Sequence, residues 1–289
     1  MDTGLILRMK FDRQEIISEN DIDYLLSESK VVQKLTKDYE DNHFFNLFRL
    51  ISLSEIPYIE RLPYTKKVLS YVSNNLATSD GFSYTGKPDY IVPCYNAMLL
   101  EAYSRLGKSD SIEVQNALNW IKKYQVFERN QSTAWKEKGI CKHGGCMNAV
   151  PCFIGIGKTI RALITYAEVT GHTDSEVEKL IEKGTAYMLR HKMYQRLSNH
   201  LPISAHIQDI VFPQAYMLSL TDLVYIAGKS NLWELENLQP LKQLLQEKGA
   251  GHNEWKIDYI YSHKGYKNYD GRRKPSEWIS YLFKTSLET

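Results

Sequence analysis

The chain has 289 residues, of which 43% are hydrophobic and 24% are charged, and these values are ordinary for a soluble globular protein. The 36 Lys and Arg residues nearly balance the 34 Asp and Glu residues, so the formal net charge is only +2. This balance argues against a nucleic acid or an anionic membrane surface as the partner.

The amino-terminal stretch "MDTGLILRMKFDRQEI" contains an apolar run of only a few residues between charges. This run is too short for the core of a signal peptide or for a membrane span, and no later stretch is long enough without a charge. We therefore expect a cytoplasmic protein without a transmembrane segment, whose cysteines are reduced thiols or metal ligands. We expect residues 1–40 to form a helical extension at the amino terminus.

Apolar helices recur along the chain, and each is expected to begin at a proline. The segments "VPCYNAMLLEAYSRLG", "VPCFIGIGKTIRALITYAEVTG", "VFPQAYMLSLTDLVYIAG" and "RKPSEWISYLF" contain Pro93, Pro151, Pro213 and Pro275, which are 58, 62 and 62 residues apart. Proline suits the first position of a helix, because the amide that it lacks has no helical partner there. These segments contain few charges, which predicts that the helices are largely buried.

A glycine joint follows three of these helices, at Gly107, Gly171 and Gly228. Glycine adopts the left-handed conformation that ends many helices, and the polar residues after each joint can cap the next helix. The segments "SIEVQNALNWIKKYQ" and "SEVEKLIEKGTAYMLRHKMYQR", which follow the first two joints, are amphipathic at helical spacing. Earlier in the chain, "DNHFFNLFRLISLSEI" and "PYTKKVLSYVSNNL" supply a first helix pair.

This alternation of buried and half-exposed helices predicts an all-α protein and, more specifically, a single α/α toroid domain over residues 1–289. We expect about five helical hairpins with inner and outer helices. An open superhelix is the alternative, but its repeats are usually about 34 to 47 residues long with brief connections. Here the repeats are longer and carry loops such as "FERNQSTAWKEKGICKHGGCMNA", and loops of this length are usually functional.

Four segments carry a resemblance to a known family: "VPCYNAMLLEAYSRLG", "CFIGIGKTIRAL", "DIVFPQAYMLSLTDL" and "DGRRKPSEWISY". Over about residues 80–286, the chain resembles the prenyltransferase and squalene-cyclase repeat proteins (the terpenoid cyclase superfamily), especially their small, uncharacterised prokaryotic branch. The resemblance implies an α/α barrel whose central cavity binds an elongated, mostly apolar, isoprenoid-like substrate. It also implies an activity of the transferase or lyase (cyclase) type.

Two catalytic motifs of that family are missing from the sequence. The Asp-x-Asp-Asp acid motif of class II terpene cyclases is absent, and its nearest approach, Asp21 and Asp23 in "NDIDY", lies outside the repeats. The aspartate-rich magnesium motifs of class I synthases are absent too. The resemblance therefore implies the fold and an apolar substrate, but it does not fix the reaction.

A cluster of thiols and one imidazole precedes the second of the proline-marked helices. The stretch "CKHGGCMNAVPC" contains Cys141, His143, Cys146 and Cys152, and Cys94 follows the proline of the helix before it. Zinc prefers thiolate and imidazole ligands, and all five side chains are expected at one rim of the ring, so the predicted cofactor is zinc. Two alternatives are buried cysteines beside a "HGG" turn, and a thiolate nucleophile at a helix amino terminus.

Three further residues are candidates for catalysis. His206 and Asp209 come just before the expected helix at Pro213, and Asp222 lies within that helix in an apolar context. A buried carboxylate must be paired, protonated or functional, so Asp222 is either catalytic or a link between neighbouring helices.

Five residues are candidates for binding the substrate. Tyr95, Tyr216 and Trp278 are placed to form aromatic walls, which stabilise positive charge that develops on a substrate. Arg272 and Arg273 precede the last helix, where basic side chains and helix amides together can bind a phosphate or carboxylate. The alternative for these arginines is a solvated turn.

The stretch "GIGKT" at residues 155–159 resembles part of a phosphate-binding loop. The full Gly-x4-Gly-Lys-Thr spacing and the preceding strand are both missing, so we reject that function. Small residues here predict close helix packing instead.

The sequence therefore leaves three hypotheses for the function. The first is an enzyme that acts on an isoprenoid-like chain, assisted by zinc. The second is a non-catalytic binding or scaffold protein that retains the toroid. The third is a carbohydrate-active α/α barrel, which needs two facing carboxylates such as Asp209 and Asp222, although these lie on adjacent helical turns.

Overall fold

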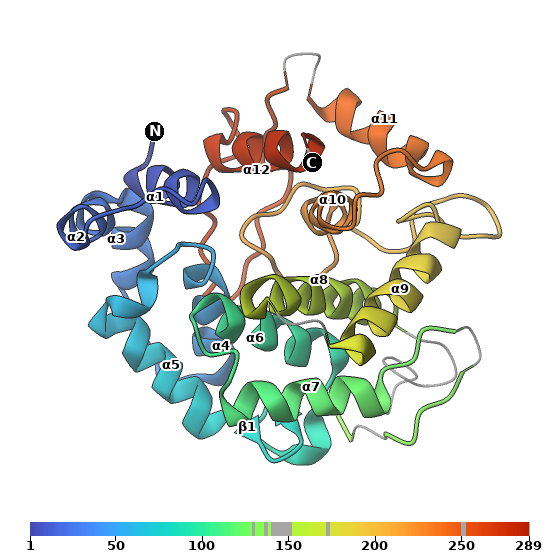
Figure 1. Ribbon diagram of the computed structural model, residues 1–289, viewed down its shortest axis with the longest axis horizontal. Coiled ribbons are helices and arrows are strands. Elements are labelled where there is room, and N and C mark those ends of the chain that lie inside the picture. The colour runs from blue at the N-terminus through green and yellow to red at the C-terminus, as the bar shows by residue number, and fades with distance from the viewer. Residues whose placement is uncertain (129–130, 136–137, 140–151, 172–173, 250–252, 289) are drawn as a thin grey trace.

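A computed structural model describes residues 1–128, 131–135, 138–139, 152–171, 174–249 and 253–288 (Figure 1). This part of the chain is mostly helical, which confirms the all-α prediction. Its α-helices are α1 (Thr3–Asp12), α2 (Glu19–Glu28), α3 (Lys30–Thr36), α4 (His43–Leu53), α5 (Pro63–Asn75), α6 (Pro93–Arg105), α7 (Ile112–Tyr124), α8 (Phe153–Thr170), α9 (Ser175–Arg190), α10 (Leu220–Lys229), α11 (Gln239–Lys248) and α12 (Glu277–Leu287). Among the described residues, strand structure is limited to an antiparallel pair, β1 (Ala77–Thr78) and β2 (Gly81–Phe82).

Helices that are buried on all sides alternate with helices that bury only one face. Every residue of α6 from Pro93 to Ser104 is buried, whereas α5 buries only Thr65, Val68 and Val72. In Figure 1, α5, α7, α9 and α11 lie at the periphery, and α4, α6, α8 and α10 lie closer to the centre. We call α4, α6, α8, α10 and α12 the core helices.

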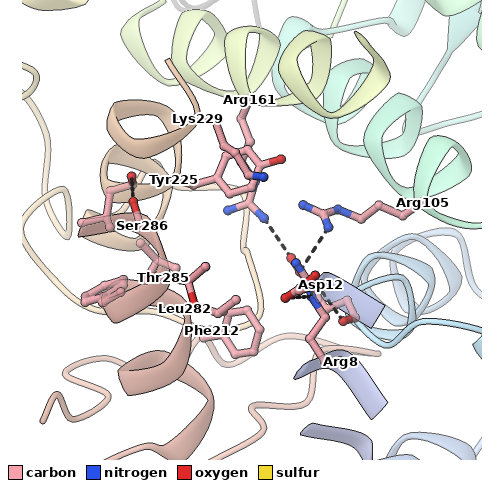
Figure 2. A pocket seen from close by; sticks show the side chains of 14 residues that line it. Arg8, Asp12, Arg105, Arg161, Phe212, Tyr225, Lys229, Leu282, Thr285 and Ser286 are labelled. Atoms are coloured by element: carbon pink, nitrogen blue, oxygen red, sulfur yellow. Dashed lines mark hydrogen bonds and ion pairs between the residues drawn. The ribbon is translucent and has the colours of Figure 1, made fainter. Parts of the chain in front are cut away.

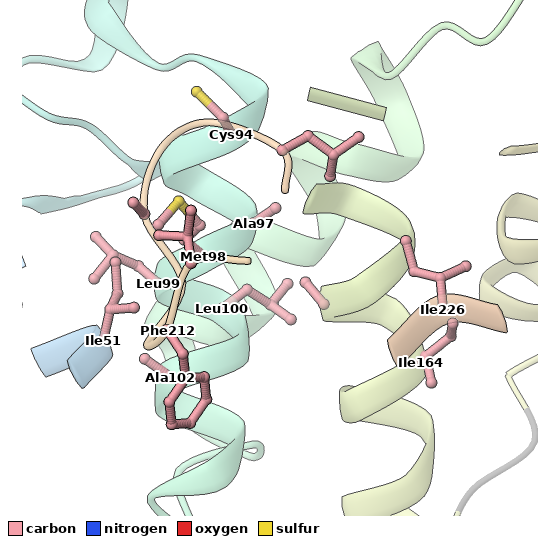
Figure 3. Close-up of a cluster of buried hydrophobic side chains, with 14 of the residues drawn as sticks. Ile51, Cys94, Ala97, Met98, Leu99, Leu100, Ala102, Ile164, Phe212 and Ile226 are labelled. Carbon is pink, nitrogen blue, oxygen red and sulfur yellow. The ribbon is translucent and has the colours of Figure 1, made fainter. Parts of the chain in front are cut away.

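Apolar side chains from several core helices meet in one hydrophobic core. Figure 3 shows part of it, where Ile51 of α4, Met98 of α6, Ile164 of α8 and Ile226 of α10 are all buried. Each fully buried aliphatic side chain contributes about 1.5–3 kcal/mol. This burial is the main reason why helices far apart in the sequence remain together.

Neighbouring core helices meet start to start and end to end. Pro93 at the start of α6 contacts the first turn of α8, because a Cβ added to Gly155 would lie 2.8 Å from the Pro93 Cβ. At the other end, Lys229 Nζ of α10 lies 2.8 Å from Glu168 Oε1 near the end of α8. The first turns therefore form an N-terminal rim and the last turns a C-terminal rim.

The first helix joins the last core helix to the first one. Asp12 at the end of α1 accepts a hydrogen bond from the Tyr281 hydroxyl of α12 at 3.1 Å. From the same helix, Arg8 Nη1 donates to the backbone carbonyl of Glu55, just after α4, at 3.2 Å. Helices α2 and α3 also lie within residues 1–40 and pack against α1.

Two of the three glycine joints form as predicted. Gly107 and Gly171 have φ values of +68° and +60°, the left-handed conformation that closes a helix. The prediction for Gly228 is wrong, because this residue lies inside α10 and Asn231 adopts the left-handed conformation (φ +52°) instead. Asn tolerates this conformation better than most residues, because its short side chain can hydrogen-bond locally.

The helix expected at Pro213 begins later. Residues 211–219 are not helical, and α10 begins at Leu220. Its start is fixed by Asp222, whose Oδ2 accepts hydrogen bonds from the backbone amide and the hydroxyl of Ser219, at 2.9 and 3.0 Å. A capping box of this kind satisfies backbone amides at the start of a helix, which have no partner within the helix. Tyr216 therefore precedes α10 and does not lie within it.

The other proline-marked helices differ less from the prediction. Pro93 is the first residue of α6, as expected. Pro275 precedes α12 by two residues, because the Ser276 hydroxyl caps that helix by accepting a hydrogen bond from the Ile279 amide at 3.0 Å. Pro151 lies outside the described residues, and α8 begins at Phe153.

Close packing at the "GIGKT" stretch is confirmed. A Cβ on Gly157 would lie 2.5 Å from Leu218 Cδ1, and one on Gly155 would meet Pro93 almost as closely. The glycines therefore let the chain on either side approach α8. Lys158, the residue after Gly157, has a completely buried side chain.

No helix in the described part of the chain is long and apolar enough to cross a membrane.

Candidate binding cavity

Charged side chains meet in the interior, where three core helices come together. Lys158 and Arg161 of α8, Glu101 of α6 and Asp222 of α10 are each at most 2% exposed. Lys158 Nζ lies 2.8 Å from Asp222 Oδ1, and Arg161 Nη1 lies 3.1 Å from the same oxygen. Arg161 Nε also donates to both carboxylate oxygens of Glu101, at 3.0 and 3.1 Å.

The network extends toward the C-terminal rim. Arg161 Nη2 lies 2.9 Å from Glu55 Oε1, and Arg105 donates from Nε and Nη2 to Glu101 Oε1, at 3.0 and 2.9 Å. Gln214 joins the network by donating to Glu101 at 3.0 Å. Burial of a charge is costly unless the charge is paired and hydrogen-bonded, and here each buried charge has a partner of opposite sign.

The pKa values reflect this pairing. Burial alone raises the pKa of Glu101, but the positive charges of Arg161 and Arg105 outweigh it and hold the pKa at about 2. Burial lowers the pKa of Lys158, and the neighbouring Asp222 charge offsets this only in part. The surrounding carboxylates raise the pKa of Arg161 despite its burial. Glu101 and Arg161 are therefore both charged at neutral pH.

A cavity of about 300 Å³ lies beside this network at the C-terminal rim (Figure 2). One part of its wall is apolar and consists of Phe212, Val224, Leu282 and Phe283. The other part is polar and consists of Arg8, Asp12, Glu55, Arg105, Arg161, Thr221, Tyr225, Lys229, Thr285 and Ser286. The cavity thus offers an apolar surface and a charged one to the same ligand.

A second cavity of about 750 Å³ adjoins the first and opens further toward the surface. The residues that line both cavities are Arg8, Asp12, Glu55, Arg105, Tyr225 and Lys229. Pockets for small molecules are usually about 300–1,000 Å³ in volume. The two cavities therefore have the size that a small organic ligand needs.

Tyr225 stands at the boundary between the two cavities. The Arg161 guanidinium lies 4.7 Å from the centre of its ring and that of Arg105 lies 5.6 Å away, both within cation–π range. Its hydroxyl shares a 2.8 Å hydrogen bond with Thr165. Burial raises the pKa of Tyr225 to about 12, so the phenol is neutral at physiological pH.

The structure separates the three residues predicted to be catalytic. Asp222 is fully buried and is committed to Lys158 and Arg161, so it links neighbouring helices. His206 and Asp209 do form a pair, with Nδ1 and Oδ2 2.7 Å apart. Neither His206 nor Asp209 is among the residues that line the two cavities.

The predicted aromatic residues take three different environments. Tyr95 lies at the N-terminal rim, where its ring centre is 6.1 Å from that of Phe48. Tyr216 is 40% exposed and its ring lies 5.9 Å from that of Tyr261. Trp278 is buried in the core and lines neither cavity; its ring lies 5.9 Å from that of Phe212.

Arg272 and Arg273 are exposed at the start of α12. Together with Lys256 and Lys274 they line a shallow surface depression, which also contains the carboxylate of Asp258. The cavity at the C-terminal rim contacts the other end of α12, at Thr285 and Ser286. The basic pair is therefore not part of that cavity.

The predicted zinc ligands are only partly described. Cys141, His143 and Cys146 lie outside the described residues. Cys94 and Cys152 lie at the N-terminal rim, at the starts of α6 and α8. Within the described ranges, no group of three or more His, Cys, Asp or Glu side chains is arranged to hold a metal ion.

A nucleophilic thiolate at Cys94 is not supported by its surroundings. Burial, together with the nearby Cys152, raises the pKa of the Cys94 thiol to about 12. The effect of the helix amino terminus is therefore smaller than the cost of burying the charge.

Sequence reasoning missed most of the charged network, although a signal for it exists. Glu101, Arg161 and Asp222 come eight, ten and nine residues after Pro93, Pro151 and Pro213. Because these charged residues lie at similar distances from the prolines of successive apolar segments, their side chains are expected to meet in the interior. Arg8 gives no such signal because it lies outside the repeats, and Glu55 gives none because no proline marks the start of its helix.

Comparisons of the chain with family models, with curated proteins and with solved structures find no match.

Proposed function

We propose that the chain is an α/α toroid that binds an elongated, largely apolar, isoprenoid-like small molecule in the cavity at the C-terminal rim. Support for the toroid comes from the alternation of core and peripheral helices, from the start-to-start contact of α6 and α8 and the end-to-end contact of α8 and α10, and from the position of α1. Helix α1 contacts α12 through Asp12 and contacts Glu55, two residues after the end of α4, through Arg8. A ring of hairpins closed by the amino-terminal helix accounts for all three observations.

The observation that carries the binding proposal is a cavity with an apolar wall that adjoins a larger cavity. The apolar wall combines Phe212, Val224 of α10, and Leu282 and Phe283 of α12. Apolar ligands gain about 25 cal/mol for each Å² of apolar surface that they remove from water. An elongated molecule can extend from this wall into the larger cavity.

This proposal favours the binding hypothesis over the carbohydrate hypothesis. The pair of carboxylates considered for a glycosidase, Asp209 and Asp222, does not form, because Asp222 is bound to Lys158 and Arg161 and neither carboxylate lines the cavities. Transferase or cyclase activity remains a prediction from the resemblance, and zinc at the N-terminal rim remains a separate prediction.

Isothermal titration of the full chain with farnesol tests the proposal. Leu282→Trp adds volume to the cavity wall and is expected to weaken binding at least about tenfold, because overpacking a cavity excludes the ligand. Leu287→Trp on the same helix is the matched control, since Leu287 is 42% exposed and lines neither cavity. Absence of farnesol binding to the unmodified chain, or equal binding by both variants, would contradict the proposal.

A further inference from the structure

Four basic side chains line one depression in the surface beside the start of α12. The depression has a volume of about 980 Å³ and is formed by residues of two segments, 256–260 and 270–277. Its basic residues are Lys256, Arg272, Arg273 and Lys274, and all four are exposed. In the described part of the chain, none of these four side chains forms an ion pair or a hydrogen bond. We call this surface the basic depression.

The carboxylates of the basic depression have partners of their own. Asp258 Oδ2 lies 2.7 Å from Lys248 Nζ, outside the depression. Asp270 Oδ2 accepts a 2.6 Å hydrogen bond from the Ser276 hydroxyl. Glu277 Oε1 lies 3.6 Å from the amino group of the first residue. The four cations therefore outnumber the three carboxylates of the depression, and none of the four is paired with one of them.

Further positive charge surrounds the basic depression. Burial and the charge of Lys267 lower the pKa of Lys34, and the charge of Asp270 raises it only in part. Asp270 therefore acts on Lys34 as well as lining the depression. The amino end of α12 adds a partial positive charge, because the first amides of a helix have no partner within it. Like charges gathered at one place repel one another, and an anionic ligand relieves this repulsion.

We propose that the basic depression binds a triphosphate group, at a site separate from the cavity at the C-terminal rim. Arg272 and Arg273 supply planar forks of donors that match phosphate oxygens, and Lys256 and Lys274 supply point charges. A single phosphate carries a charge of about −1.5 to −2, which leaves part of the positive charge uncompensated. A triphosphate carries about twice that charge and matches four cations better.

Other ligands fit the basic depression less well. A lone carboxylate has a single charge, and an acidic peptide distributes its charges along an extended chain, whereas linked phosphates concentrate them. A nucleic acid is disfavoured by the charge balance of the whole chain, whose formal net charge is only +2. Apolar side chains are few in the depression (Ile257, Ile260 and Pro275), so it does not suit an apolar ligand.

Titration of inorganic triphosphate, ATP and inorganic phosphate into the full chain tests the proposal. We expect triphosphate to bind at least about tenfold more tightly than phosphate, because it pairs with more of the cations, and added salt should weaken its binding. The double variant Arg272→Gln/Arg273→Gln is expected to bind triphosphate at least about tenfold more weakly. It should fold normally, because both side chains are exposed. Equal affinities for ATP and inorganic triphosphate would support a site for the triphosphate alone, and tighter binding of ATP would support a site for a nucleotide.

The matched control is Lys87→Gln/Arg196→Gln, which also removes two exposed charges without an ion-pair partner among the described residues, but away from the depression. Equal losses of affinity in the two double variants, or equal affinities for triphosphate and phosphate, would overturn the proposal. Tighter binding of a short single-stranded DNA or of a glutamate-rich peptide, lost in Arg272→Gln/Arg273→Gln, would overturn the choice of a triphosphate. Both double variants are expected to bind farnesol as the unmodified chain does, so failure of the triphosphate site leaves the proposed function intact.

Discussion

Lys158 and Asp222 lie on neighbouring core helices with Nζ and Oδ1 2.8 Å apart, and neither side chain is exposed. This pair links α8 to α10 in the interior. The cavities lie beside the charged network, toward the C-terminal rim. Glu55, Arg105 and Arg161 are the members of the network that line them.

Replacement of Asp222 tests whether this residue is structural. Asp222→Asn leaves Lys158 and Arg161 with less compensation, and breaking a buried ion pair from one side typically costs about 3–5 kcal/mol. We expect a loss of this size in the free energy of unfolding, measured by urea denaturation. The control is Glu128→Gln, which removes an exposed pair with Arg190 and is expected to cost less than about 1 kcal/mol. Equal stabilities of the two variants would show that Asp222 is not structural.

The low pKa of Glu101 predicts how stability depends on pH. Because the pKa in the folded chain is about 2 and the ordinary value is 4.5, the unfolded chain takes up a proton first as the pH falls. The contribution of Glu101 is therefore fully present above about pH 4.5 and is lost between there and about pH 2. Urea denaturation of the unmodified chain and of Glu101→Gln should show a stability difference that shrinks across this range. A difference that does not change with pH would contradict the assignment.

Close packing of α8 predicts the effect of an added methyl group. Gly157→Ala would place a Cβ 2.5 Å from Leu218 Cδ1, so the chain before α10 has to move. Overpacking of this kind costs about 1–3 kcal/mol, which thermal or urea denaturation can measure. Gly271→Ala is the control, since nothing lies within 4 Å of its added Cβ. Equal stabilities would show that α8 and its neighbour are packed less tightly.

Zinc at the N-terminal rim predicts a measurable metal content. Elemental analysis of the purified, untagged chain should find about one zinc ion per chain, and Cys146→Ser should lose it, because thiolates are strong zinc ligands. The control is Cys94→Ser, whose buried thiol has a raised pKa and is the weaker candidate. Absence of zinc from the unmodified chain would mean that the cluster serves packing and a turn.

The spacing of apolar residues, prolines and glycines predicts much of the fold. Where a helix begins at another residue than predicted, local hydrogen bonds explain the difference. Gly107 and Gly171 take the predicted conformation because each closes a strongly patterned helix. Pro213 predicts a helix start about seven residues too early, since proline identifies only a permitted start. Ser219 and Asp222 form the actual start, because the Asp222 carboxylate accepts hydrogen bonds from the amide and the hydroxyl of Ser219, the residue that caps α10.

The candidate site is less predictable than the fold. Glu101, Arg161 and Asp222 could be found from their similar depth in successive segments. Arg8 could not, because its place in the cavity wall depends on how α1 packs between α12 and α4. A site assembled from helix ends and one distant helix leaves no local motif in the sequence.

Hydrogen exchange with and without farnesol tests the central claim, which is the location of the ligand at the C-terminal rim. We expect slower amide exchange on ligand addition in residues 224–231 and 281–288, which surround the cavity. We expect no change at the N-terminal rim, in residues 90–97 and 259–264. Protection confined to the N-terminal rim would contradict the account, because the ligand would then lie near the cysteines and tyrosines at the opposite ends of the core helices.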